Sequence, residues 1–272
     1  MDDAPDRGET GGSEARDVWN PGQYHRFQAE RAQPFEDLLG LVRPTASSRV
    51  ADLGCGTGEL TLRLHRELAA RETTGVDSSS AMLERARATS IPGLRFVHAH
   101  IEDWLAESGE SQDVIVSNAA LQWCEGHDEL FARLAARLSP RGQLAVQMPA
   151  NHDHPTHTLA AALALESPFV ELLGGHVRHS PVQSPERYAA LMHRLGFREQ
   201  HVRLQVYGHV LDSAAEVVEW VKGTLLTDYQ KRLPESAFEE FLRRYREAVL
   251  AALGSERPHF YPFKRLLLWA RF

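Results

Sequence analysis

The segment VADLGCGTGEL, residues 50–60, decides the fold. A short apolar run leads into three glycines at alternate positions, Gly54, Gly56 and Gly58. Glycine lets the backbone turn sharply and approach a ligand at a distance that a Cβ would block. An apolar strand, a glycine-rich turn and an amphipathic helix together are typical of a ligand-binding α/β unit. The segment therefore predicts an α/β fold with a ligand at this turn.

The chain around this turn alternates strands with helices. Several of the strands are apolar almost throughout, which is typical of a parallel sheet covered on both faces. A helix at 127–138 is expected to stop at the SPRG sequence, 139–142. We expect strands at 47–54, 73–77, 94–99, 113–119 and 143–149, and helices within 19–41 and at 59–70, 78–88 and 127–138.

The regular alternation of strands and helices ends after Pro149. Helical patterns cover 154–174, 184–197, 214–229 and 235–254, and strand patterns cover 199–211 and 263–272. The sequence predicts a doubly wound, mostly parallel seven-stranded Rossmann-like sheet, with a helical cap over the carboxyl edge where such sheets bind ligands. The predicted units are a disordered tail (1–17), an α/β core (18–150), a cap insertion (151–182), a core helix and strand (183–211), a second cap insertion (212–256) and a closing core strand (257–272).

Composition narrows the class of protein. The 272 residues carry a formal net charge of −7, which argues against a nucleic-acid partner because phosphate binding needs a basic surface. No apolar run approaches the ~20 residues that span a bilayer, and the N-terminal residues lack the apolar segment of a secretory signal. With only Cys55 and Cys124, a reducing cytoplasm is expected. The oligomeric state, a monomer included, stays open.

The residues around the glycines indicate which ligand is held. A dinucleotide fingerprint requires a small residue at position 59, but Glu59 stands where the pyrophosphate would lie. Asp52 precedes the loop and would attract a cation, and Asp77 ends the next strand, where it can accept both hydroxyls of a ribose. A ribose, a positive charge and no phosphate describe S-adenosylmethionine. We therefore expect this cofactor, and a nicotinamide dehydrogenase is disfavoured by Glu59.

Longer motifs resemble a known family. DLGCGTG, VDSSSAM, DVIVSNAALQW and LSPRGQLAVQMP resemble the strand-end motifs of class I S-adenosylmethionine-dependent methyltransferases. WNPGQYHRFQAERAQPF, QMPANHDHPTH, QSPERYAALM and YPFKRLLLWARF are similar to the trans-aconitate 2-methyltransferase family, over nearly the whole chain beyond residue 17. The resemblance implies that a cofactor pocket is formed by Asp52, Gly54, Gly56, Gly58, Asp77, Ser78, Met82, His100, Ile101, Glu102, Asn118 and Arg31.

The methyl acceptor is less clearly specified. Members of the family often carry an acid at His100 and some carry an arginine near Thr227, so whether trans-aconitate itself is accepted stays open. The resemblance implies that His157 orients the substrate. The substrate candidates are the aromatic residues Trp19, Tyr24 and Trp123, together with His157, Tyr261 and Arg265.

The expected reaction is methylation of a small-molecule carboxylate to a methyl ester by in-line displacement. A carboxylate is already ionised at pH 7 and requires no general base, so no residue is assigned a catalytic role. The histidines of NHDHPTH, at 152, 154 and 157, are not expected to bind a metal. Alternatives are a methyltransferase for a hydroxyl or amine, where a histidine base is expected, and a non-catalytic S-adenosylmethionine-binding protein.

Overall fold

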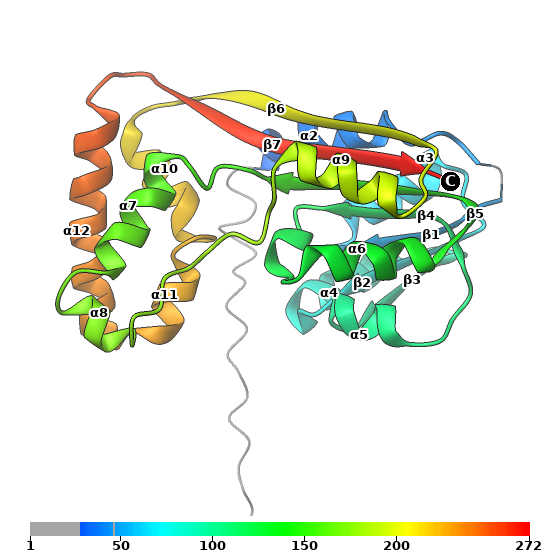
Figure 1. The fold of residues 1–272 in the computed structure, drawn as a ribbon, viewed down its shortest axis with the longest axis horizontal. Helices are drawn as coiled ribbons and strands as arrows, with labels where there is room; N and C mark the ends of the chain where they lie inside the picture. Colours follow the sequence, from blue (N-terminus) through cyan, green and yellow to red (C-terminus); the bar gives the residue numbers. More distant parts are fainter. Residues whose placement is uncertain (1–27, 46) are drawn as a thin grey trace, which may run out of the picture.

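A seven-stranded sheet forms the centre of the protein, in the order β3-β2-β1-β4-β5-β7-β6 (Figure 1). The computed structural model describes residues 28–45 and 47–272, without the side chains of residues 28–32. All neighbouring strands are parallel except β7, which runs antiparallel to β5 and to β6. This confirms the predicted fold class. The strands are β1 (Arg49–Leu53), β2 (Glu72–Asp77), β3 (Leu94–His98), β4 (Gln112–Asn118), β5 (Leu138–Pro149), β6 (Glu199–Leu211) and β7 (His259–Arg271).

The chain reverses its winding direction at β1. From β1 it proceeds outward through β2 to β3, and then returns to place β4 on the other side of β1. In open α/β sheets the ligand crevice lies at the carboxyl ends of the strands at such a switch point. The glycine-rich loop after β1 and the loop after β4 therefore meet at the expected binding edge.

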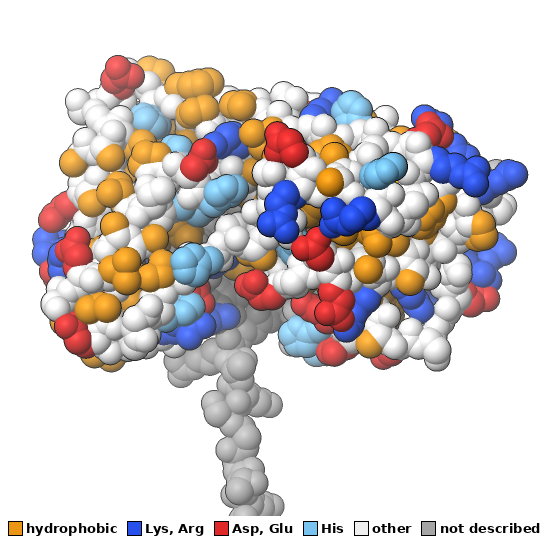
Figure 2. Space-filling view, viewed as in Figure 1, with side chains coloured by type: hydrophobic (Ala, Val, Ile, Leu, Met, Phe, Trp, Pro, Cys, Tyr) orange, Lys and Arg blue, Asp and Glu red, His pale blue; other side chains and the backbone are white. Residues whose placement is uncertain are grey.

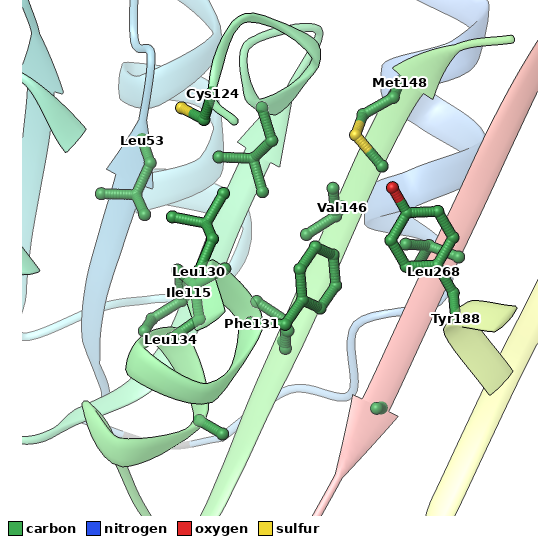
Figure 3. Close-up of a cluster of buried hydrophobic side chains, with 14 of the residues drawn as sticks. Leu53, Ile115, Cys124, Leu130, Phe131, Leu134, Val146, Met148, Tyr188 and Leu268 are labelled. Atoms are coloured by element: carbon green, nitrogen blue, oxygen red, sulfur yellow. The ribbon is translucent and has the colours of Figure 1, made fainter. Parts of the chain in front are cut away.

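Helices cover both faces of the sheet with apolar side chains. On one face, α2 and α3 pack on Val50, Val114 and Trp269. On the other, Phe131 and Leu134 of α6 pack on Ile115, Val146 and Leu268 (Figure 3). The helices of the core are α2 (Gln28–Leu39), α3 (Glu59–Glu67), α4 (Ser80–Ala86), α5 (Ile101–Ala106), α6 (His127–Ala136) and α9 (Pro185–Arg194), with short 3-10 turns η1 (Arg87–Thr89) and η2 (Leu121–Trp123).

A helical cap lies beside the core, at the left of Figure 1. It has its own apolar cluster, in which the ring of Phe169 meets that of Phe241 edge-on, 5.0 Å between centroids. Tyr261 and Phe263 from the start of β7 belong to the same cluster and so join the cap to the sheet. The cap consists of α7 (Pro155–Ala164), α8 (Phe169–Leu172), α10 (Ala214–Lys222), α11 (Thr227–Arg232) and α12 (Glu235–Leu253), which fall within the two predicted insertions.

Some element boundaries differ from the expectations. The helix expected at 127–138 ends at Ala136, and the SPRG sequence lies inside β5. The helix thus ends just before SPRG, as expected, but the pairing of β5 with β4 shifts between Leu138 and Gln143, and residues 139–142 form an irregular part of the strand. The helical stretches expected at 154–174 and 214–229 are each interrupted, before α8 and after Lys222. None of the described helices is long and apolar enough to cross a membrane.

Candidate functional site

The glycine-rich loop is held against β2 and against the loop after β4. The backbone N–H groups of Gly54 and Cys55 both donate to the carbonyl of Val76, at 2.8 and 3.0 Å. Gly54 has a φ of +80°, and a Cβ added there would lie 2.1 Å from the Cβ of Ala120. Only glycine allows this approach, which brings the carboxyl ends of β1 and β4 together.

Asp77 is fixed by the backbone on either side of it. One carboxylate oxygen accepts a hydrogen bond from the N–H of Gly56 at 2.9 Å, and the other accepts from the N–H of Ser79 at 2.8 Å. The hydroxyl of Ser79 in turn accepts from the N–H of Met82 and caps α4. These bonds orient the Asp77 carboxylate at the carboxyl end of β2 before any ligand arrives.

These groups border a cavity of about 340 Å³, which we call the sheet-edge cavity. Nine of the predicted cofactor residues line it, and the cap contributes Gly223, Thr227 and Lys231. The predicted residues that line it are Gly54, Gly56, Asp77, Ser78, Met82, His100, Ile101, Glu102 and Asn118.

The other three predicted cofactor residues are placed differently. Asp52 is buried and does not line the cavity, since its carboxylate accepts a hydrogen bond from the Thr61 hydroxyl at 2.7 Å. Burial, with a smaller contribution from the charge of Asp77, raises the pKa of Asp52 to about 6, although the hydrogen bond from Thr61 opposes this. Gly58 starts α3 at a φ of +78°, where an added Cβ would lie 2.7 Å from Phe96. Arg31 is in α2, but its side chain lies outside the described residues.

The sheet-edge cavity fits S-adenosylmethionine better than a dinucleotide. Asp77 offers a fixed carboxylate for ribose hydroxyls, and Met82 and Ile101 offer apolar surface for a base. Asn118 adds a buried amide oxygen that has no hydrogen-bond partner among the described residues. Such an oxygen suits a positively charged ligand and opposes a phosphate. Glu59 at the first turn of α3 places another carboxylate where a pyrophosphate would lie.

A second cavity, of about 690 Å³, lies between the core and the cap; we call it the cap cavity. Three of the predicted substrate residues line it: Trp123, His157 and Arg265. Tyr261 does not, because it is fully buried in the cap cluster and its hydroxyl accepts a hydrogen bond from the side-chain amide of Asn151. Trp19 and Tyr24 lie outside the described residues.

The lining of the cap cavity is basic. It includes Arg178, Lys222 and Arg265, and the described lining contains no aspartate or glutamate. This contrasts with the chain as a whole, whose formal charge is −7. Figure 2 shows histidines on the cap side of the boundary between cap and core, and Lys and Arg side chains mixed with Asp and Glu on the core side. The cavity is therefore suited to an anionic ligand.

The histidine loop is ordered by its own hydrogen bonds. The Nδ1 atom of His154 accepts from the N–H of Thr156 and caps α7. His157 lines the cap cavity, and its Nδ1 atom bonds the Thr156 hydroxyl at 3.1 Å. Burial, with the nearby His154, lowers the pKa of His157 to about 4, so its imidazole is neutral at pH 7. Within residues 28–45 and 47–272, no group of three or more histidine, cysteine, aspartate or glutamate side chains is placed to hold a metal.

The two cavities share one wall. Asn118, Ala119 and Trp123 of the core and Gly223 and Thr227 of the cap line both of them. Ala119 has a left-handed φ of +57°. Its N–H donates to the carbonyl of Gln147 at 2.9 Å, and its carbonyl accepts from the Gln122 side chain at 2.6 Å. A left-handed φ is unfavourable for alanine, and these two hydrogen bonds help to hold Ala119 in it. The shared wall therefore contains a locally strained residue.

Sequence reasoning missed several residues of the cap cavity. Arg178 and Lys222 line it, yet neither belongs to a recognisable motif, and each comes from a different segment of the chain. The only signal was a basic, histidine-containing stretch, HVRHS at 176–180, after two glycines. Such a stretch is as typical of a solvated loop as of a binding site.

Comparison with known proteins agrees with the fold. Residues 50–142 match a family described as a methyltransferase domain. The structure superposes on YcgJ from Bacillus subtilis with a TM-score of 0.59, 17% identity and coverage of 88% of this chain and 98% of the other. It superposes on the mycolic acid cyclopropane synthase CmaA1, solved with S-adenosylhomocysteine, with a TM-score of 0.56, 16% identity and coverage of 94% and 92%. At these identities the likeness extends to the fold alone.

The fold and the sheet-edge cavity together define a class I S-adenosylmethionine-dependent methyltransferase. A trans-aconitate 2-methyltransferase from Deinococcus radiodurans is 43% identical over 259 residues, which cover 93% of this chain and 98% of the relative. Another from Paracidovorax citrulli is 37% identical over 256 residues, with the same coverage. The chain belongs to the trans-aconitate 2-methyltransferase family. The resemblance found in the sequence motifs is confirmed.

Proposed function

We propose that this methyltransferase esterifies one carboxylate of a small polyanionic acid, and that trans-aconitate, which names its relatives, is such an acid. The charge of the cap cavity carries the proposal. Arg178, Lys222 and Arg265 line the cavity together with three histidines, and its described lining holds no carboxylate. A carboxylate ligand is the natural counter-charge for arginine, which binds it through two parallel hydrogen bonds.

The departures from the family pattern are compatible with this substrate. The stretch VKGTLLTDY around Thr227 contains no arginine. Arg178 and Lys222 nevertheless bring cations to the cavity that Thr227 lines. His100 stands where relatives often carry an acid, and Glu102 lines the sheet-edge cavity two residues later. The cofactor residues that we propose are the nine predicted ones that line the sheet-edge cavity; Asp52 instead accepts a hydrogen bond from Thr61 of α3.

The proposed mechanism uses alignment and exclusion of water. The cofactor, when bound, supplies a methyl group on a positively charged sulfur. The protein holds an acceptor carboxylate at the wall formed by Asn118, Ala119 and Thr227, so that its oxygen faces the cofactor side. The cap covers both ligands and keeps water from the reacting groups.

The lining of the cap cavity disfavours a hydroxyl or amine acceptor. Such an acceptor would lose a proton in the reaction and would need a base with a pKa near 7. No aspartate or glutamate is present in the described lining, and the pKa of His157, about 4, makes this histidine, the one predicted from the sequence to orient the substrate, a weak base. An ionised carboxylate has no proton to lose, so the neutral His157 is left to donate or accept a hydrogen bond.

The test is turnover of a panel of acids with methyl-labelled S-adenosylmethionine. We expect a labelled monomethyl ester from trans-aconitate, identified by mass spectrometry, and a rate that does not depend on the deprotonation of a general base. Esters from no carboxylic acid, together with transfer to a hydroxyl or amine and a rate rising with pH, would favour the other acceptor class. Cofactor binding by calorimetry without turnover of any acceptor would indicate a non-catalytic binding protein.

We also propose the cellular compartment in which the enzyme acts. Cys55 and Cys124 are both buried free thiols, which fits a reducing compartment, and we place the enzyme in the cytoplasm. Its ligands on this view are small molecules, with no role for nucleic acid. Sedimentation of the purified protein would give the oligomeric state.

A further inference from the structure

Arg178 occupies a distinctive position in the cap cavity. It lies in the linker 173–184 between α8 and α9, half-buried, and lines the cavity. Its guanidinium carbon lies 4.4 Å from the centre of the Trp123 ring. Its Nη1 atom lies 3.4 and 3.5 Å from the carbonyls of Thr224 and Leu225. Trp123 belongs to the core and the two carbonyls to the cap, so Arg178 is held between both parts.

The guanidinium of Arg178 makes no direct contact with a carboxylate among the described residues. No ion pair joins it to any acid among the described residues, and its hydrogen bonds there go to neutral carbonyls at long distance. Asp228 is engaged elsewhere, with one oxygen on His176 at 2.7 Å and the other on Arg232 at 3.2 Å. Burial lowers the pKa of Arg178, and the more distant charges of Asp228 and Glu125 offset this only in part. A desolvated cation that makes no direct ion pair is costly, and a bound anion would offset that cost.

The position of Trp123 locates this cation relative to the reacting groups. Trp123 belongs to the wall that both cavities share, whose other members, Asn118, Ala119, Gly223 and Thr227, are uncharged. An arginine bound to both oxygens of the reacting carboxylate would withdraw charge from them and weaken the nucleophile. The reacting carboxylate therefore belongs at the uncharged wall, and the guanidinium beside it is placed for another carboxylate of the same acid.

We propose that Arg178 binds a carboxylate of the acceptor other than the one that is methylated, and so determines which carboxylate reacts. The inference rests on the proposed function, since it assumes a polycarboxylate in the cap cavity. It assigns Arg178 a specificity-determining role: it binds substrate through its planar fork but takes no part in the bond changes.

The experiment compares Arg178→Ala and Arg178→Lys with the wild-type enzyme on four acids. These are trans-aconitate and the three dicarboxylates made by replacing one of its carboxylates with hydrogen. We expect Arg178→Ala to raise the KM for trans-aconitate ~10–100-fold through loss of a bidentate charged pair. Arg178→Lys keeps the charge without the fork and should fall between. One of the dicarboxylates lacks the carboxylate that Arg178 is proposed to bind. For that acid, Arg178→Ala should change the KM by about 2-fold or less.

The product adds a readout that a structural role would not move. Wild-type enzyme should give mainly one monomethyl ester of trans-aconitate, and Arg178→Ala should give a mixture of positional isomers, separable by chromatography. Arg187→Ala, at an exposed arginine of α9 outside both cavities, is the matched control and should behave as wild type. Cofactor affinity, measured by calorimetry with S-adenosylhomocysteine, should be unchanged in all variants and reports correct folding.

Two results would overturn the inference. One is an equal loss for all four acids with the isomer ratio unchanged, which indicates a structural role. The other is no loss at all. Both differ from failure of the proposed function, in which the wild-type enzyme itself forms no ester from any of the acids. If Arg178→Ala does not fold, the dependence on substrate and the isomer ratio of Arg178→Lys decide the question.

Discussion

The sheet-edge cavity and the cap cavity are built in opposite ways. The first is formed by short motifs at the carboxyl ends of neighbouring strands, with Asp77 fixed by N–H groups within two residues of it or in the adjoining loop. The second collects side chains from a core turn, the histidine loop, the 173–184 linker, the α10–α11 region and β7. Local backbone geometry thus positions the groups proposed to bind the cofactor, whereas packing of distant segments positions those proposed to bind the acceptor.

The substitution Asp77→Ala tests this contrast with the largest expected effect. It removes two charged hydrogen bonds to ligand, each worth roughly 1.5–3 kcal/mol, so cofactor affinity should fall by a factor of 100 or more. The KM for the acid, measured at saturating cofactor, should change little, because Asp77 lines only the sheet-edge cavity. Glu84→Ala, at an exposed position on α4, is the control. An unchanged dissociation constant for S-adenosylhomocysteine would show that the cavity is misassigned.

The next largest effect separates two glycines of one loop. Gly54→Ala forces a Cβ to 2.1 Å from Ala120 at a positive φ, and should lower the free energy of unfolding by roughly 2–5 kcal/mol. Gly56→Ala, also at a positive φ, meets nothing within 4 Å and should lower it by only about 1–2 kcal/mol. Its Cβ enters the sheet-edge cavity, so the main loss there should be cofactor affinity. Urea unfolding and calorimetry of both variants test this; equal unfolding free energies would contradict it.

Asp52 gives a pH-dependent test. Its folded pKa of about 6 lies above the ordinary value of 3.8, so between these pH values the folded protein keeps a proton that the unfolded chain has lost. The free energy of unfolding should therefore fall as pH rises through this window, by up to about 3 kcal/mol at about 1.4 kcal/mol per pKa unit.

Asp52→Asn keeps an acceptor for the Thr61 hydroxyl and removes the titration. Its unfolding free energy should exceed that of wild type at pH 7 and approach it at pH 4, as measured by urea unfolding. If Asp52 also stabilises the bound cation electrostatically, cofactor affinity should drop in the same variant. Identical pH profiles for the two proteins would mean that Asp52 ionises normally.

Much of the cofactor half could be predicted from the sequence, because strand-end motifs carry their own geometry. Nine of the twelve predicted cofactor residues line the sheet-edge cavity. Asp52 points to the limit of this reasoning: its spacing predicted a group near the cation, but the side chain turns inward to Thr61. The cap cavity was less predictable. Arg178 reaches the cavity through a linker that packs on Trp123, and Tyr261 does not line it because the cap cluster buries it.

The smallest expected effect concerns the wall between the cavities. Ala119→Gly relieves a left-handed φ of +57° that costs an L-residue about 1–2 kcal/mol, less the added entropy of the unfolded glycine. We expect the free energy of unfolding to rise by about 0.5 kcal/mol. Ala120→Gly, at a φ of −123°, should instead lower it by about as much. Loss of stability in both would mean that Ala119 is not strained.

The shared wall has a thermodynamic consequence. Because Asn118, Ala119, Trp123, Gly223 and Thr227 border both cavities, a ligand in either one alters the surface that the other ligand meets. By linkage, whatever factor the cofactor applies to the affinity for the acid, the acid must apply to the affinity for the cofactor. Binding titrations of one ligand at several fixed concentrations of the other would measure that single factor from both directions.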